Sequence, residues 1–141
     1  MDIRNELIKK IRAQELLCAQ GSRPVVSLED FFSGNFDYGS IGCNLAISPG
    51  PQGFFNILKA IRDNDSVQDV LVEVNEVVED YPQTWPFADR IYVLSSASAN
   101  EVRAWLAPLE PDDLSEGWAN GTPPAVPVLK SGVKVYAAWW D

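Results

Sequence analysis

The sequence predicts an α+β fold in which a mainly antiparallel sheet is covered on one face by two helices. Apolar residues recur at helical spacing in residues 52–62 and 99–107. They alternate at strand spacing in four shorter stretches, residues 41–47, 67–78, 90–95 and 133–140. The resulting order of strand, helix, strand, strand, helix, strand is the βαββαβ order of a four-stranded, ferredoxin-like sheet.

The length of the chain favours a single domain. A chain of 141 residues can bury one sizeable core, and its 46% of hydrophobic residues is typical of a globular protein. We expect one domain over residues 1–141, with a helical extension at 1–37 and the βαββαβ core at 38–141. No apolar run reaches the roughly 20 residues that cross a bilayer, and no signal peptide is apparent, so we expect a cytoplasmic protein.

The N-terminal extension is predicted to contain two helices. Ile3, Leu7 and Ile11 stand four residues apart, which gives a helix over residues 2–19 one apolar face. Gly21 follows as a typical helix terminator. Ser27 can cap a second, short helix that ends before Gly34.

In the stretch from Ile41 to Arg62 the spacing of apolar residues changes from strand-like to helical across one short loop. Its first part alternates as one face of a strand, and the Pro49–Pro51 turn then separates it from the helix of residues 52–62. The second and third strands are joined by a loop at 80–89, so we expect them to pair as an antiparallel hairpin. The residues predicted to point toward the helices are Cys43, Leu45, Val72, Val74, Ile91, Val93, Val135 and Ala137.

The second helix begins at a capping box, Ser98 with Glu101, in which each side chain can bond the backbone N–H of the other residue. The connection that follows, residues 109–132, is long for a compact domain. A single helical turn at 112–116 is one interpretation of it. A hidden short strand, or a segment wrapped around the edge of the sheet, is the other.

The residues that most catalytic sites depend on are missing. The chain has no histidine, which removes the commonest general base and metal ligand. The turn Ser48–Gly53 lacks the Lys-Ser/Thr ending of a phosphate-binding loop. Cys18 and Cys43 stand in apolar patterns, so we expect two buried, reduced thiols. We therefore predict that the chain is not an enzyme and binds no metal and no cofactor.

The net charge of −9 is unevenly distributed. Between Glu73 and Glu116 ten acidic residues stand against two basic ones, Arg90 and Arg103. A surface built from this stretch would repel nucleic acid and anionic lipid, because binding of either depends on cationic side chains. We expect neither nucleic acid nor a membrane as a partner, but another protein with a basic surface.

Large aromatic side chains are expected near this acidic charge. If one face of the sheet is open, aromatic residues of the hairpin loop and of the last two strands lie on it, and such residues are enriched in interfaces. The alternative is that residues 1–37 and 109–132 fold over that face and make it a second core layer. The predicted partner-binding residues are Glu76, Glu79, Asp80, Tyr81, Trp85, Phe87, Tyr92, Tyr136 and Trp140.

The segment ISPGPQGFFNILKAI, residues 47–61, supports a second functional interpretation. With its preceding strand it resembles the opening of amino-acid-binding regulatory domains of the ACT type, over about 35 residues. The prolines on both sides of Gly50 depart from that pattern. The resemblance implies a sensor that holds a metabolite beside residues 49–53, in a pocket shared between the two copies of a homodimer.

Overall fold

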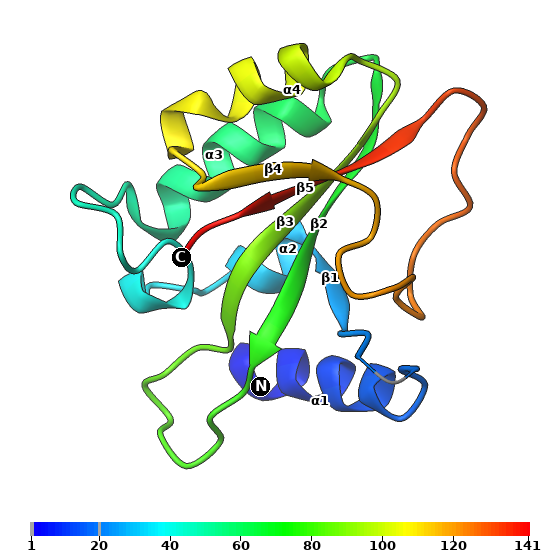
Figure 1. Cartoon of the computed structure of the whole chain (residues 1–141). Helices are drawn as coiled ribbons and strands as arrows, with labels where there is room; N and C mark the ends of the chain where they lie inside the picture. Colours follow the sequence, from blue (N-terminus) through cyan, green and yellow to red (C-terminus); the bar gives the residue numbers. More distant parts are fainter. Residues whose placement is uncertain (1, 20) are drawn as a thin grey trace.

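The computed structural model describes residues 2–19 and 21–141 of the chain, and its fold is α+β (Figure 1). No helix in these residues is long and apolar enough to cross a membrane. The α-helices are α1 (Ile3–Glu15), α2 (Leu28–Phe32), α3 (Gly50–Arg62) and α4 (Ala99–Leu106), with short 3₁₀ helices η1 (Tyr38–Ser40) and η2 (Ala107–Leu109). The strands are β1 (Val25–Ser27), β2 (Val67–Glu76), β3 (Phe87–Ser95), β4 (Asp113–Glu116) and β5 (Lys134–Trp139).

The strands form one open sheet in the order β1-β2-β3-β5-β4. Every neighbouring pair is antiparallel, as predicted. The predicted hairpin is present as β2 and β3, which pair Val70 with Val93 and Val72 with Ile91. The sheet has five strands instead of the predicted four, and the ferredoxin-like order is not confirmed.

Residues 41–47, predicted as the first strand, form turns instead. Gly42 has a φ of +62°, and the N–H of Leu45 donates to the carbonyl of Gly42 at 3.1 Å. A Cβ atom on Gly42 would lie 2.7 Å from the ring of Phe54, so this close approach requires glycine. The apolar alternation was therefore misleading, and Cys43, predicted to be buried, is exposed.

The two edge strands lie in segments for which the sequence analysis did not predict a regular strand. β1 lies inside residues 1–37, which were predicted to be helical, and it pairs Val26 with Val72. β4 lies in the long connection and pairs Ser115 with Ala137, so the hidden strand, and not the helical turn, is the correct interpretation there. Segments of three or four residues show no usable period, and pairing with a longer neighbour decides their structure.

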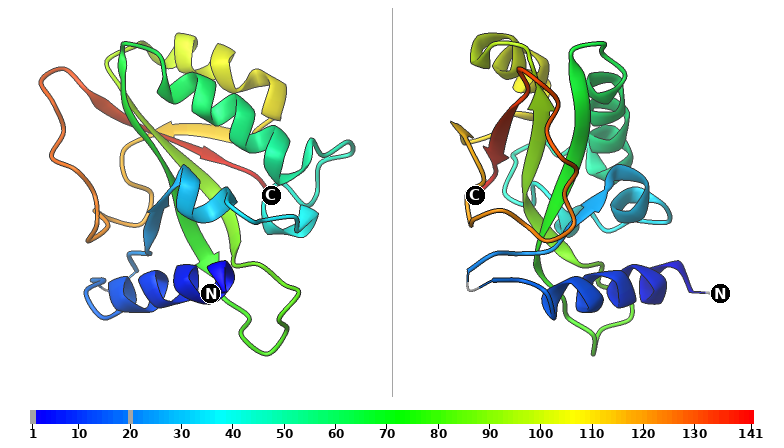
Figure 2. Two further views of the ribbon diagram at one scale, coloured as in Figure 1. Left: turned by 180° about the vertical axis from the view of Figure 1, so that it is seen from behind. Right: turned by 90° about the vertical axis from the view of Figure 1, so that its right-hand side faces the viewer.

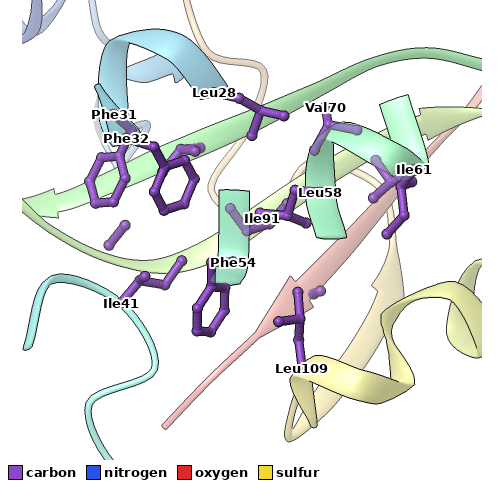
Figure 3. Packing of buried hydrophobic residues seen from close by; sticks show 14 of the residues in the cluster. Leu28, Phe31, Phe32, Ile41, Phe54, Leu58, Ile61, Val70, Ile91 and Leu109 are labelled. Carbon is purple, nitrogen blue, oxygen red and sulfur yellow. The ribbon is translucent and has the colours of Figure 1, made fainter. Parts of the chain in front are cut away.

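One face of the sheet carries the larger apolar core, under helices α2, α3 and α4 (Figure 3). Phe54 and Leu58 of α3 and Leu106 of α4 are fully buried there. The two predicted helices therefore pack on the same face, and four of the residues predicted to point toward them, Val72, Val74, Ile91 and Val93, do so.

The orientation predicted for the last strand is wrong. Tyr136 and Trp140 of the last segment point into the helix-covered core, where the Trp140 ring packs edge-on against Phe54 at 5.5 Å. Val135 and Ala137, predicted to occupy that core, lie on the opposite face. Both faces of β5 are apolar, so the alternation alone could not decide between them.

Polar partners inside the core fit the observed orientation. The Tyr136 hydroxyl donates to the carbonyl of Ala97 at 2.7 Å, and Trp140 Nε1 donates to the carbonyl of Leu109 at 2.7 Å. Both aromatic side chains therefore bury their rings without leaving a polar atom unpaired.

The second face of the sheet is covered by the irregular segment 117–133 (Figure 2). Trp118, Val126 and Val133 of this segment pack on a smaller apolar cluster. Helix α1 does not take part, because its buried Leu7 and Ile11 belong to the larger core. The second face is thus a covered layer, as one of the two predicted alternatives had it. The cluster comprises Val25, Leu71, Tyr92, Leu94, Val135 and Ala137.

Candidate functional site

The nine residues predicted to bind a partner do not share one surface. Four of them, Trp85, Tyr92, Tyr136 and Trp140, are at most 8% exposed, which corrects their assignment to a binding face. Phe87 is half-buried at the start of β3. The remaining four side chains are exposed and follow one another around the β2–β3 hairpin loop: Glu76, Glu79, Asp80 and Tyr81.

The hairpin loop, residues 77–86, is held against helix α1 by the buried side chain of Arg4. Arg4 Nε donates to the carbonyl of Thr84 at 2.8 Å. Arg4 Nη2 donates to the carbonyls of Val78 at 2.8 Å and Tyr81 at 3.2 Å. Three backbone carbonyls of the loop thus bond one charged side chain, which ties the loop to α1.

A second contact fixes the far end of the same loop. Asp37, in the segment between α2 and η1, accepts the backbone N–H of Trp85 through Oδ2 at 3.0 Å. Its other oxygen, Oδ1, accepts the N–H of Gly39 at 2.9 Å. The Asp37 carboxylate therefore joins the hairpin loop to the neighbouring loop and keeps its charge near both.

Both of the loops that Asp37 joins carry exposed aromatic rings. Tyr81 is 65% exposed on the hairpin loop, and Phe36 and Tyr38 are 79% and 61% exposed on the neighbouring loop. Phe36 and Tyr38 were missed in the sequence analysis, although two aromatic residues flanking an acid between glycines are unusual for a plain linker. We use the name hairpin surface for the side chains of Phe36, Tyr38, Glu76, Glu79, Asp80 and Tyr81.

The hairpin surface has a mainly acidic character. One of its carboxylates, Glu79, is paired with Arg12 of α1 at 3.0 Å. This pair is half-exposed on both sides and therefore contributes little to stability, but it holds Glu79 close to the helix. No ion pair is found for Glu76 or Asp80 within residues 2–19 and 21–141.

A buried carboxylate, Glu73, lies on the second face of the sheet. Its side chain is 1% exposed, and each oxygen has a partner. Oε1 accepts the Tyr92 hydroxyl at 2.7 Å. Oε2 accepts Arg90 Nη1 at 3.2 Å and Asn120 Nδ2 at 3.1 Å.

This network ties the irregular segment 117–133 to the sheet. The Tyr92 hydroxyl also accepts the N–H of Ala119 at 3.2 Å, and the Tyr92 ring packs edge-on against Trp118 at 4.8 Å. Burial, followed by the hydrogen bond to Glu73, raises the pKa of Tyr92. Both oxygens of Glu73 and the Tyr92 hydroxyl are paired, so the network holds the segment to the sheet.

The other end of the segment is held in a similar way. Gln68 Nε2 donates to the carbonyl of Val128 at 2.9 Å, and Gln68 Oε1 accepts the N–H of Lys130 at 2.9 Å. Residues 117–133 are thus attached to the sheet at two separate points.

The turn at residues 49–53, beside which the sensor interpretation places a metabolite, is occupied by a side chain of the chain itself. A Cβ atom on Gly50 would lie 2.6 Å from the ring of Tyr38, so that ring fills the space over the turn. The strand that the ACT resemblance requires before this turn is also absent. The sensor interpretation therefore lacks its geometric basis.

Within the described part of the chain no three His, Cys, Asp or Glu side chains are close enough together to hold a metal ion. Cys18 and Cys43 are both free thiols, half-buried and exposed respectively.

Comparison with known proteins gives one family. The model of the Uncharacterized protein YfbO family matches residues 2–138. The Uncharacterized protein YfbO of Escherichia coli (strain K12) is 38% identical over 120 residues, which cover 84% of each chain. No solved structure matches the chain.

Proposed function

The chain belongs to the YfbO family, and we propose that it is a non-catalytic module that binds another protein through the hairpin surface. One observation carries this proposal: a buried arginine, Arg4, fixes the very loop that exposes acidic and aromatic side chains. A loop that is ordered before binding loses less conformational entropy when the partner arrives. Exposed tyrosines on such a loop are typical anchors of protein interfaces.

The charge of the chain indicates the kind of partner. With a net charge of −9 and carboxylates grouped on the hairpin surface, it would attract a basic protein surface and repel nucleic acid and anionic membranes. The absence of histidine and the fully paired state of Glu73 support a role without catalysis.

The test compares proteins from the native host that are retained by the immobilised full chain. One variant, Asp80→Lys with Tyr81→Ser, alters the hairpin surface. A matched control, Asp65→Lys with Ile47→Ser, makes the same charge change and replaces another large side chain by serine, at two other exposed positions. We expect a partner that the wild type and the control retain, that the hairpin variant loses, and whose association rate falls as salt is raised. Equal retention by all three proteins, or no retained protein at all, would contradict the proposal.

A further inference from the structure

An open groove of about 540 Å³ adjoins the hairpin surface. Three separate segments form it: the start of α1, the loop before η1, and the end of the hairpin loop. Its lining includes Asp2, Phe36, Asp37, Tyr38, Gln83 and Trp85.

The aromatic walls of the groove are held in place. The Tyr38 ring rests on Gly50, at a distance that leaves no room for a side chain there. Trp85 is 8% exposed, and its backbone N–H is bound to Asp37. Phe36 is the most exposed of the three rings, so its face is available to a ligand.

Within residues 2–19 and 21–141, neither carboxylate of the groove forms an ion pair. Asp37 accepts two backbone N–H groups, and Asp2 accepts the N–H of Asn5 at the start of α1. Arg4 also lines the groove, but its guanidinium donates to the hairpin carbonyls instead. Each carboxylate is therefore held in a fixed direction with its negative charge uncompensated by a direct ion pair.

From this arrangement we infer that the groove receives an arginine side chain of the partner protein. This inference rests on the proposed function and adds the chemistry of the contact. A guanidinium group can stack on an exposed aromatic face and at the same time donate hydrogen bonds to a carboxylate. The exposed rings of Phe36 and Tyr38 line the groove, and Asp37, which stands between them in the sequence, supplies the acceptor. A lysine ammonium is more strongly hydrated and cannot stack in the same way.

The probe is a capped tripeptide, acetyl-Gly-Arg-Gly-amide, titrated into the isotopically labelled full chain and followed by NMR. Two further peptides replace arginine by lysine or by citrulline, which has the shape of arginine without its charge. We expect saturable shifts at the backbone amides of Gly39 and Trp85, the two N–H groups bound to Asp37. The lysine peptide should bind at least about fivefold more weakly, and the citrulline peptide should produce no saturable shift.

Variants locate the contact. Phe36→Ser changes an exposed side chain and should weaken arginine binding at least about fivefold. Asp37→Asn should weaken it further, with folding checked by the dispersion of the spectrum. Ile47→Ser and Asp65→Asn are the matched controls and should bind like the wild type. Equal shifts at the acidic segment 110–116, or unaltered binding by Phe36→Ser, would overturn the inference.

The two proposals can fail separately. The capture experiment alters Asp80 and Tyr81, which do not line the groove, whereas the titration reads the groove alone. A partner that depends on the hairpin surface, together with no arginine binding, would leave the proposed function standing and remove the groove from it. Arginine binding in the groove without any captured partner would leave the arginine site standing and remove the proposed protein-binding function.

Discussion

The two faces of the sheet are covered by different kinds of structure. Three helices cover one face and bury large side chains such as Phe31, Phe54 and Trp140. The irregular segment 117–133 covers the other, over a cluster of six buried residues. Helices satisfy their own backbone groups and can bury apolar area freely, whereas an irregular segment must find partners for its backbone. Accordingly, the second face contains Glu73, Tyr92 and Gln68, whose side chains bond that segment.

The largest expected effect is on the helix-covered face. Replacing Trp140 by alanine removes a side chain that is 1% exposed and leaves the carbonyl of Leu109 without its donor. We expect the free energy of unfolding to fall by about 3–5 kcal/mol. Urea denaturation of the variant and the wild type measures it. A loss below about 1 kcal/mol would mean that Trp140 does not belong to the core.

The next effect is on the second face. Glu73→Gln keeps the shape of the side chain but leaves the charge of Arg90 without its buried partner. Because Arg90 is 19% exposed and partly solvated, we expect a loss of about 2 kcal/mol in the free energy of unfolding. The control is Glu76→Gln, an exposed carboxylate of the same strand, which should change stability by less than about 0.5 kcal/mol. Equal effects of both changes would argue against the network.

A smaller effect is expected from Tyr92→Phe, which keeps the ring and its contact with Trp118. The variant loses the hydrogen bonds to Glu73 and from Ala119. We expect a loss of about 1–2 kcal/mol in the free energy of unfolding. Cleavage within residues 117–133 under limited proteolysis should also become faster, because one of the two attachments of the segment is weakened. Unaltered cleavage would show that the segment is held mainly by apolar contacts.

The smallest effect on the free energy of unfolding is expected from an ion pair between two helices of the helix-covered face. Arg62 of α3 donates to both oxygens of Glu29 of α2, at 2.7 and 2.6 Å, and these bonds lower the pKa of Glu29. A carboxyl whose pKa is lowered by folding stabilises the folded state above its ordinary pKa and loses that contribution as the pH falls.

Glu29→Gln should therefore reduce stability by about 0.5 kcal/mol at pH 7, since the carboxylate is half-exposed. The difference between variant and wild type should shrink as the pH falls below 4.5, the ordinary pKa of the group. Denaturation at a series of pH values tests this, and a difference that grows in acid would contradict the assignment.

The long elements could be predicted because each of them has regularly spaced apolar residues or a local signal such as a helix cap. The capping box at Ser98 and Glu101 is present as predicted, and both of its hydrogen bonds are formed. The β2–β3 hairpin was likewise indicated by two alternating strands with one loop between them. Local sequence determines such elements, since their hydrogen bonds and caps lie within a few residues.

The edge strands and the candidate site could not be predicted in the same way. β1 forms because it hydrogen-bonds to β2, and β4 forms because it hydrogen-bonds to β5. The local sequence of neither short strand specifies its partner. The orientation of β5 depends on where Tyr136 and Trp140 find acceptors, which is a property of the folded core. The hairpin surface also depends on a distant contact, because Arg4 lies more than seventy residues before the loop that it holds.

The strand order has a consequence for the folding of the chain. β2 and β3 are consecutive strands joined by a single loop, residues 77–86, so their pairing is the most local in the sheet and costs the least loop-closure entropy. β4 precedes β5 in the chain and pairs only with β5, so the edge of β3 is closed only when β5 docks on it. A chain in which β5 is not docked exposes that edge of β3, and an exposed strand edge is where two molecules can pair with each other.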